Sequence, residues 1–321
     1  MEYNSEPRRI IKFGNSSYII SLPKPWIEKN KIKKGDLVYV GENVNNELII
    51  NTSKKSTKSN KSITINIDNK DFGELRREVA SAYINNHNEI ILTGKDMAKR
   101  NSIIAKALQE KIGIEIIEQT PEQTIAKDVL DFEAISLHKI IKRMDLMIKS
   151  MFEDLITGFG KEKFKEWVSK EINQTDSEVN KLYFLIWKIA RKCQEDPSIV
   201  VQLKTNGAFV SNAQWLSLQL EYIGDEIKRI SKLLVNFEFK KDEKEKLCEI
   251  LNSLEGDYAE IMGAYYKDDK EMARKISGKK EKLLDSCSAL LRVNTSEMGV
   301  IAEKLKAMCI GIHNISKLIA Y

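Results

Sequence analysis

Two acidic side chains on one helical face are the first residues in this sequence that could do chemistry. Glu221 and Asp225 lie four residues apart in the segment LEYIGDEIKRI. On an α-helix this spacing makes the two carboxylates neighbours, and their repulsion costs about 0.2–0.5 kcal/mol unless a cation compensates it. Carboxylate oxygens suit hard divalent cations, manganese and iron. An ion pair between Asp225 and Arg229, one turn later, would compensate equally well, and the residues alone favour that pair.

The rest of the sequence adds no catalytic motif to these carboxylates. It lacks a nucleophile elbow, an HExxH segment and a Walker loop. Its four cysteines form no CxxC pair, and its three histidines are far apart in the chain. We therefore expect a protein that is not an enzyme.

A second group of polar residues lies near the start of the chain and is basic. Residues 1–62 contain 12 of the 52 Lys and Arg residues but only 6 of the 47 Asp and Glu residues, so the remainder is close to neutral. This asymmetry predicts a polyanion-binding region, although an ordinary solvated basic face remains the alternative. Cations neutralise phosphates, and Asn and Ser can contact phosphates or base edges. The candidate DNA-binding residues are Arg8, Arg9, Lys12, Asn15, Ser16, Ser17 and Lys24.

Short strands must position these basic residues. The pattern predicts strands over 8–13, 18–22, 37–40 and 48–50, with a turn at Gly14 and Asn15. Pro23 ends the second strand because it cannot donate to a ladder, and Pro25 suits the first turn of a helix over 26–30. A unit of residues 1–53 buries too little apolar surface alone, which favours dimerisation. The polar, basic segment 54–61 reads as a linker.

This N-terminal segment resembles a known DNA-binding family. The stretch RRIIKFGNSSYIISLPKPWIEKNKIKKGDLVYV, followed by ELII, is similar to the SpoVT/AbrB (MazE-like) swapped-hairpin domain. The shared features are the basic first strand, the Gly-Asn-Ser-Ser turn, the Leu-Pro-Lys step and the Gly-Asp pair before a Val-rich strand. The resemblance implies that two chains interleave their strands into one small barrel. It also implies that the first strand and the loop after it face DNA.

The next region, residues 62–130, alternates between strand and helix patterns. We expect strands over 63–67, 89–92 and 114–117, with helices over 71–84 and 96–112. This order predicts a small α/β domain. It contains no Gly-rich phosphate loop.

The last region, residues 131–321, is helical. Apolar residues recur every three or four positions, which predicts bundle packing. We expect six helices, over 131–157, 162–196, 208–236, 240–266, 268–292 and 296–320. A weak repeat relates EIKRISKLLV, residues 226–235, to GIHNISKLIA, residues 311–320. Such a repeat is typical of two duplicated three-helix units, here 131–236 and 237–321.

The helical region resembles the PhoU family of phosphate-uptake regulators. The segment LEYIGD, residues 220–225, is similar to its Glu-x-Ile-Gly-Asp signature, and DSEVNKLYFLI, from Asp176, is similar to its second-helix motif. The resemblance implies two three-helix bundles with acidic metal sites. It adds Asp176 to Glu221 and Asp225 as ligands of a divalent or iron-type metal ion in the first bundle.

The match to the PhoU pattern is incomplete. Asn180 stands where the family's second helix has another acid. In the second bundle the repeat aligns Lys306 with Glu221 and Ile310 with Asp225, and a looser alignment places Lys280 opposite Asp176. We expect a partial metal site in the first bundle and none in the second.

Together these features predict a multidomain cytoplasmic regulator. The expected order is a small all-β swapped-hairpin domain, a small α/β domain and an all-α pair of PhoU-like three-helix bundles. The expected function is transcriptional regulation of phosphate uptake by a DNA-binding homodimer or larger oligomer. The alternative is a PhoU-like module that binds a phosphate-transporter ATPase or a signalling kinase and uses its N-terminal domain only to dimerise. No apolar run approaches the roughly 18–20 residues of a membrane span, so we expect no membrane insertion.

Overall fold

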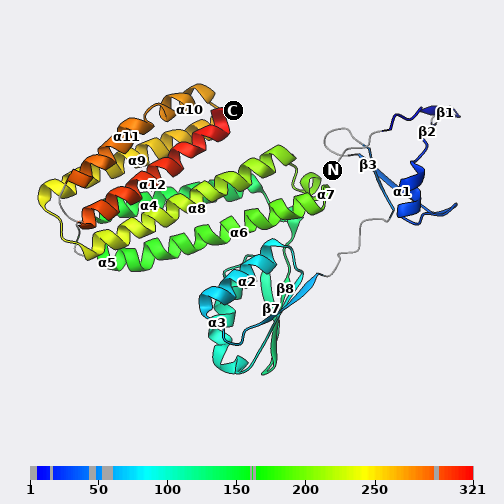
Figure 1. The fold of residues 1–321 in the computed structure, drawn as a ribbon, viewed down its shortest axis with the longest axis horizontal. Helices are drawn as coiled ribbons and strands as arrows, with labels where there is room; N and C mark the ends of the chain where they lie inside the picture. The colour runs from blue at the N-terminus through cyan, green and yellow to red at the C-terminus, as the bar shows by residue number, and fades with distance from the viewer. Residues whose placement is uncertain are drawn as a thin grey trace. The chain divides into compact units, whose positions relative to one another are not determined.

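The computed structural model describes residues 6–14, 17–42, 48–52, 61–159, 161, 164–292 and 296–320. The chain divides into two compact units, residues 1–59 and 60–321 (Figure 1). The predicted order of a small β region, an α/β region and a helical region is confirmed.

The N-terminal unit consists of two short antiparallel strand pairs and one helix. Strand β1 (Ile11–Phe13) pairs with β2 (Ser17–Ile19), and β3 (Tyr39–Glu42) pairs with β4 (Leu48–Asn51). The first two strands are shorter than predicted. Helix α1 (Lys24–Lys29) follows Pro23 and carries Pro25 in its first turn, so it begins two residues before the predicted helix.

The register of β1 and β2 separates an apolar face from a basic one. Ile11 lies opposite Ile19, and Lys12 lies opposite Tyr18. Because side chains alternate along a strand, Ile11, Phe13 and Ile19 share one face while Lys12 points to the other. Among the side chains of this unit that the structure describes, none is buried. The described residues of a single chain therefore give this unit no hydrophobic core.

The α/β region forms a four-stranded sheet with two helices. Its elements are β5 (Ser62–Asn66), α2 (Phe72–Ile84), β6 (Glu89–Thr93), α3 (Met97–Gln109), β7 (Ile114–Gln119) and β8 (Gln123–Asp128). The sheet order is β5-β6-β8-β7, with β5 and β6 parallel and the other pairs antiparallel. Figure 1 shows α2 and α3 together on one face of the sheet. Strand β8 is missing from the sequence prediction because its buried residues, Thr124 and Ala126, carry little apolar signal.

The helical region is built from two sets of three long helical segments. The first set is α4 (Leu137–Gly158); α5 (Phe164–Trp167) with a π-helical turn η2 (Val168–Ile172) and α6 (Asn173–Glu195); and α8 (Gly207–Asn236). The second set is α9 (Lys241–Lys267); α10 (Lys270–Ser277) with α11 (Lys280–Ala289); and α12 (Ser296–Ala320). Short elements η1 (Phe132–Ala134), α7 (Ser198–Gln202) and η3 (Leu290–Arg292) complete the chain.

One hydrophobic core runs through both sets of helices. Helices α8 and α12, which hold the two halves of the weak repeat, pack against each other along this core. Gly311 of α12 permits the close approach, because a Cβ there would lie 3.0 Å from the Tyr222 ring. The predicted domain boundaries at 130 and 236 remain predictions. Of the predicted linker 54–61, only Lys61 is among the described residues.

Several predicted helix boundaries are wrong for local reasons. The helix expected from residue 131 begins at Leu137, where the Ser136 side chain caps it. The helix expected over 268–292 is two helices, α10 and α11, separated at Gly278 and Lys279. Helix α7 was not predicted.

Candidate functional site

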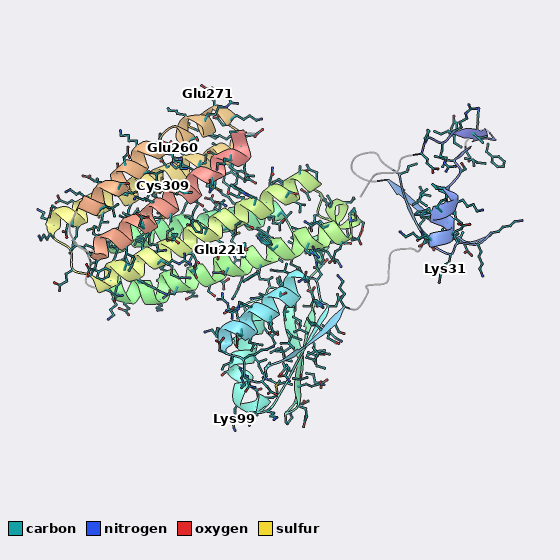
Figure 2. The ribbon with its side chains drawn as sticks, in the orientation of Figure 1. Lys31, Lys99, Glu221, Glu260, Glu271 and Cys309 are labelled. Carbon is teal, nitrogen blue, oxygen red and sulfur yellow. The ribbon has the colours of Figure 1, made fainter. Side chains whose placement is uncertain are left out.

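The three predicted metal ligands lie on two adjacent helices of the first set. Asp176 belongs to α6, just after the π-helical turn, and Glu221 and Asp225 belong to α8 (Figure 2 labels Glu221). The ammonium group of Lys228 lies between two of them. Its Nζ is 2.6 Å from Asp176 Oδ2 and 2.8 Å from Asp225 Oδ1. A lysine therefore joins the two helices at the position where the sequence predicts a metal ion.

The predicted ion pair on α8 is also present. Arg229 Nη2 lies 2.9 Å from Asp225 Oδ2, so the interpretation favoured by the residues alone is confirmed. The role of Lys228 was missed. It lies three residues after Asp225, a spacing that also permits contact on a helix, but only the packing of α6 against α8 brings Asp176 to it.

Burial and like charge make this carboxylate cluster sensitive to protons. Burial, with help from Asp225 and Asp176, raises the pKa of Glu221 to about 7. Burial also raises the pKa of Asp176, and the hydrogen bond from Lys228 opposes that rise. Burial lowers the pKa of Lys228, but its hydrogen bonds to Asp176 and Asp225 outweigh this effect and raise it overall.

Replacing Glu221 by glutamine is expected to stabilise the protein at pH 8 but not at pH 5. An unfolded glutamate has a pKa near 4.3, against about 7 in the folded protein. Between these values the folded state holds a proton that the unfolded chain has lost, so stability falls as pH rises through this window. Urea unfolding should show a gain of about 1–3 kcal/mol at pH 8 for Glu221→Gln.

The matched control is Glu249→Gln, an exposed glutamate of α9. Its difference from wild type should be the same at both pH values. A gain for Glu221→Gln that does not change between pH 5 and pH 8 would contradict the raised pKa.

The described residues form no preformed metal-binding site. No group of three or more His, Cys, Asp or Glu among them is placed to hold a metal ion. Asn180 is turned toward its own helix, where its Nδ2 donates to the Asp176 carbonyl at 3.2 Å. Asp176, Glu221 and Asp225 do suit a hard cation by their chemistry, but such a cation would have to displace Lys228. The metal ion remains a prediction.

The second set of helices carries different polar contacts at the positions that the repeat aligns. Lys306 forms an ion pair with Glu303 at 2.9 Å. The buried acid of this set is Asp257 on α9, with His313 Nε2 at 3.3 Å and Lys279 Nζ at 3.5 Å. The sequence does not predict this group, because its members lie on three separate segments.

The described basic candidates of the N-terminal unit are accessible. Arg8 and Arg9 precede β1, Lys12 lies on β1, and Lys24 begins α1; all four are exposed, as is Ser17 at the start of β2. Arg8 pairs with Glu6, and Lys24 lies 3.7 Å from Glu28. The candidates Asn15 and Ser16 lie outside the described residues. Lys12 thus presents a charge on the face opposite the apolar one.

Comparison with known families finds a match, and it lies in the N-terminal unit. Residues 11–60 match the family model of antidote-toxin recognition MazE, a bacterial antitoxin. No curated protein matches the chain. The match supports the predicted MazE/AbrB-like domain, whereas the resemblance of the helical region to PhoU remains a prediction. In the described part of the chain, no helix is both long and apolar enough to cross a membrane.

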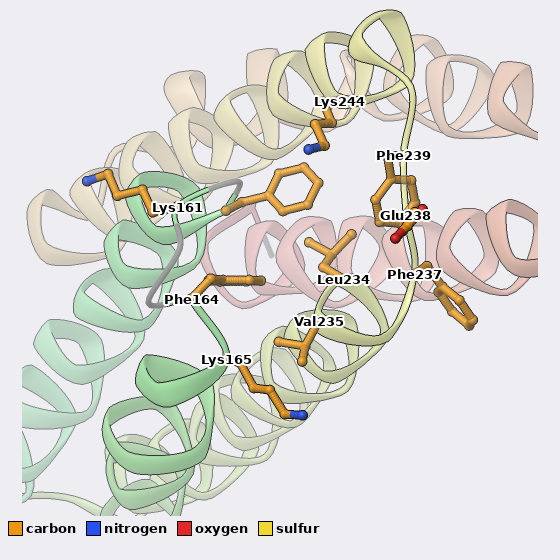
Figure 3. A pocket seen from close by; sticks show the side chains of 10 residues that line it. Lys161, Phe164, Lys165, Leu234, Val235, Phe237, Glu238, Phe239 and Lys244 are labelled. Carbon is orange, nitrogen blue, oxygen red and sulfur yellow. The ribbon is translucent and has the colours of Figure 1, made fainter.

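A cavity of about 460 Å³ lies at one end of the helical region. Phe159, Phe164 and Phe239 line it, and Phe159 contacts the other two rings edge-on. Figure 3 shows Phe164, Leu234 and Phe239 between the α4–α5 and α8–α9 connections, with Lys161 pointing away. Residues 160, 162 and 163 of the first connection are outside the described residues, so we assign this cavity no ligand.

Proposed function

We propose that this chain is a DNA-binding regulator of phosphate uptake that acts as a homodimer. The single observation that carries the DNA-binding part is the match of residues 11–60 to a MazE-type domain. The concentration of net positive charge in residues 1–62 supports it. The absence of a buried side chain among those described in this unit supports a dimer, because a second copy would supply the missing core.

The register of β1 and β2 gives each face of the hairpin a separate role. The face with Ile11, Phe13 and Ile19 would pack against the second copy. The opposite face carries Lys12, and Arg8 and Arg9 lie just before it in the chain. Phosphate contacts of this kind supply most non-specific DNA affinity and make binding salt-dependent.

Removing Arg8 and Lys12 together should weaken DNA binding at least tenfold at about 0.1 M salt. Each lost phosphate contact should also lower the slope of log affinity against log salt by about 0.9. A gel shift on the protein's own promoter and on phosphate-transport promoters, at several salt concentrations, measures both quantities for Arg8→Ala with Lys12→Ala.

The control variant is Lys95→Ala with Lys99→Ala, which removes the same charge from exposed residues of unit 60–321. It should bind DNA like wild type. If wild-type protein binds none of these promoters at low salt, the DNA-binding proposal is wrong.

The helical region would sense the state of the cell through the Asp176–Lys228–Asp225 bridge. The resemblance to PhoU supports a metal or phosphate signal, and the half-buried carboxylates at this bridge support a cation. A metal ion that replaced Lys228 between α6 and α8 would change how these helices are joined. In a dimer, the two N-terminal units could transmit this change to the spacing of the two DNA half-sites that they bind.

Lys228→Met should lower the free energy of unfolding by about 1–3 kcal/mol, because Asp176 then loses its cation and Asp225 keeps only Arg229. Mn²⁺ should recover this loss and should raise the melting temperature of the variant more than that of wild type. Lys232→Met, on an exposed position of the same helix, is the control and should lose little stability. If Mn²⁺ stabilises neither wild type nor Lys228→Met, the metal proposal fails.

A protein-binding regulator is the second candidate function, and the family description favours it, because that family is named for toxin recognition. In this case the N-terminal unit would dimerise without binding DNA, and the helical region would bind a transporter ATPase or a kinase. Arg8→Ala with Lys12→Ala separates the two functions. Phosphate-dependent regulation in cells persists in this variant if the chain acts through proteins, and is lost if it acts through DNA.

A further inference from the structure

A groove of about 530 Å³ runs between helix α2 of the α/β region and helix α6 of the first helical set. Helix α2 contributes Arg76, Arg77 and Asn85, and helix α6 contributes Asn180, Phe184 and Trp187. All these residues belong to unit 60–321. The volume lies in the range of small-molecule sites, which form preferentially where two structural layers meet.

The groove is electropositive. Arg77 is exposed and has no carboxylate partner among the described residues. Arg76 forms an ion pair with Glu110, in which Arg76 Nε lies 2.6 Å from Glu110 Oε2. Gly73, which also lines the groove, leaves room beside the Arg77 guanidinium: a Cβ there would lie 3.4 Å from Nη1. Both arginines line the groove, and guanidinium groups are suited to bind phosphate groups.

A third cation lies behind the groove. Lys111 is 2% exposed, and its Nζ makes no hydrogen bond to any described residue. This ammonium lies 4.3 Å from the centre of the Phe184 ring and 3.8 Å from Glu110. Burial lowers the pKa of Lys111 to about 8, with Glu110 opposing and Arg76 and Lys181 adding to the decrease. Glu110 and the Phe184 ring compensate this buried charge in part, and a further anion nearby would stabilise it.

The helix α6 side of the groove is aromatic. Phe184 and Trp187 lie three residues apart, on one face of the helix, and both line the groove. The Trp187 Nε1 donor is buried without a hydrogen-bond partner among the described residues. Buried donors of this kind are uncommon in proteins, and a bound acceptor would satisfy this one. Asn85 and Asn180 add amide groups; each Nδ2 donates one hydrogen bond to its own helix, at the Ser81 and Asp176 carbonyls, and each amide can still donate a second bond and accept others.

We propose that the groove between α2 and α6 binds a small organic phosphate with a planar ring, the chemical class of a nucleotide. Arg77 and Arg76 bind the phosphate groups, and Lys111 adds a third positive charge behind them. Phe184 and Trp187 contact the ring, and the amides of Asn85 and Asn180 read its edge.

The same site is connected to the carboxylate cluster. Asn180 Nδ2 lies 3.5 Å from Asp176 Oδ2 and donates to the Asp176 carbonyl, and Asp176 in turn binds Lys228. A ligand that takes the Asn180 amide removes a contact of Asp176. The groove is therefore placed to influence the bridge between α6 and α8. The nucleotide site itself does not depend on the DNA-binding proposal.

Titration calorimetry on the full chain tests this proposal with ATP, AMP, adenosine and inorganic phosphate as probes. We expect saturable binding of ATP and AMP, with adenosine and inorganic phosphate each at least tenfold weaker. Arg77→Ala should weaken ATP binding about 10- to 100-fold, the loss typical of a charge-assisted hydrogen bond. Arg191→Ala, an exposed arginine of α6 outside the groove, should bind ATP like wild type.

Tryptophan fluorescence gives a second readout. Of the four tryptophans, Trp187 lines the groove. ATP should therefore quench the emission of wild type, and Trp187→Phe should abolish that quenching. Arg8→Ala with Lys12→Ala should keep both binding and quenching, which excludes the N-terminal unit as the site.

Three results would overturn the proposal. One is no saturable ATP binding at millimolar concentration. Another is ATP affinity unchanged in Arg77→Ala while the variant remains folded by circular dichroism. The third is inorganic phosphate binding as tightly as ATP, which would leave the aromatic residues without a role.

Discussion

Replacing Ile19 by aspartate is expected to halve the mass of the protein in solution and to abolish its DNA binding. Ile19 is 45% exposed in the single chain, and Ile11 and Phe13, on the same face of the hairpin, are 62% and 65% exposed. Exposed apolar clusters of this kind are uncommon on monomers. Burying each side chain against a second copy would contribute about 1.5–3 kcal/mol.

An aspartate at position 19 would place a charge in that interface without a partner, which costs several kcal/mol. Because the described side chains of this unit form no core of their own, we expect loss of dimerisation and loss of ordered hairpin structure together. The helical region should remain folded, since its core lies within unit 60–321.

Light scattering after size-exclusion chromatography measures the mass, and a gel shift measures DNA binding. The control is Leu146→Asp, which introduces the same charge at a 55% exposed position of α4. It should remain a dimer. A dimeric Ile19→Asp that still binds DNA would show that this face is not the dimer interface.

The sequence predicts those features of the fold that depend on local periodicity. The apolar stripe through Leu220, Ile223 and Ile227 predicts α8 to within one residue, and all three side chains are buried. Pro25 predicts a helix near its own position, although α1 begins two residues before the predicted helix, and β2 ends at Ile19, before the end predicted from Pro23. Strand β8 was missed because Thr124 and Ala126 are not apolar enough to reveal the alternation.

The candidate site could be predicted only in part, because its contacts join distant segments. Asp225 and Arg229 are one helical turn apart, so the sequence alone predicts their pairing. Asp176 and Lys228 are separated by 52 residues and meet only through the packing of α6 on α8. The groove between α2 and α6 has the same origin. Its two walls are about 100 residues apart in the chain, and each wall alone is an ordinary helix face.

A large loss of stability is expected when one partner of a buried ion pair is removed. This pair joins the α/β region to the helical region. Lys188 of α6 is fully buried, and its Nζ lies 2.8 Å from Asp128 Oδ2 at the end of β8. The same ammonium donates to the Tyr83 carbonyl at 3.2 Å and lies 4.6 Å from the centre of the Tyr83 ring. Burial lowers the pKa of Lys188, and Asp128 opposes that decrease. The charge of Lys188 is therefore maintained chiefly by one carboxylate.

Asp128→Ala should lower the free energy of unfolding by about 3–5 kcal/mol, because it leaves the buried ammonium without its counter-charge. The double variant Asp128→Leu with Lys188→Met should lose far less, within about 1–2 kcal/mol of wild type, because it removes both charges and keeps the volume apolar. Urea denaturation at pH 7 compares the two. The control is Lys127→Ala, next to Asp128 on β8, which removes an ion pair with Glu89 of the neighbouring strand β6. It should lower the free energy of unfolding by less than about 1 kcal/mol.

The difference between the single and double variants decides what this pair contributes. If Asp128→Ala and the double variant lose the same stability, then packing at the junction matters and the charge does not. If only the single variant loses stability, the pair stabilises the contact of α6 with β8 and, through the Lys188 hydrogen bond to the Tyr83 carbonyl, with α2. In that case Asp128→Ala should also weaken ATP binding in the groove, although Asp128 does not line it, because both walls of the groove depend on that contact.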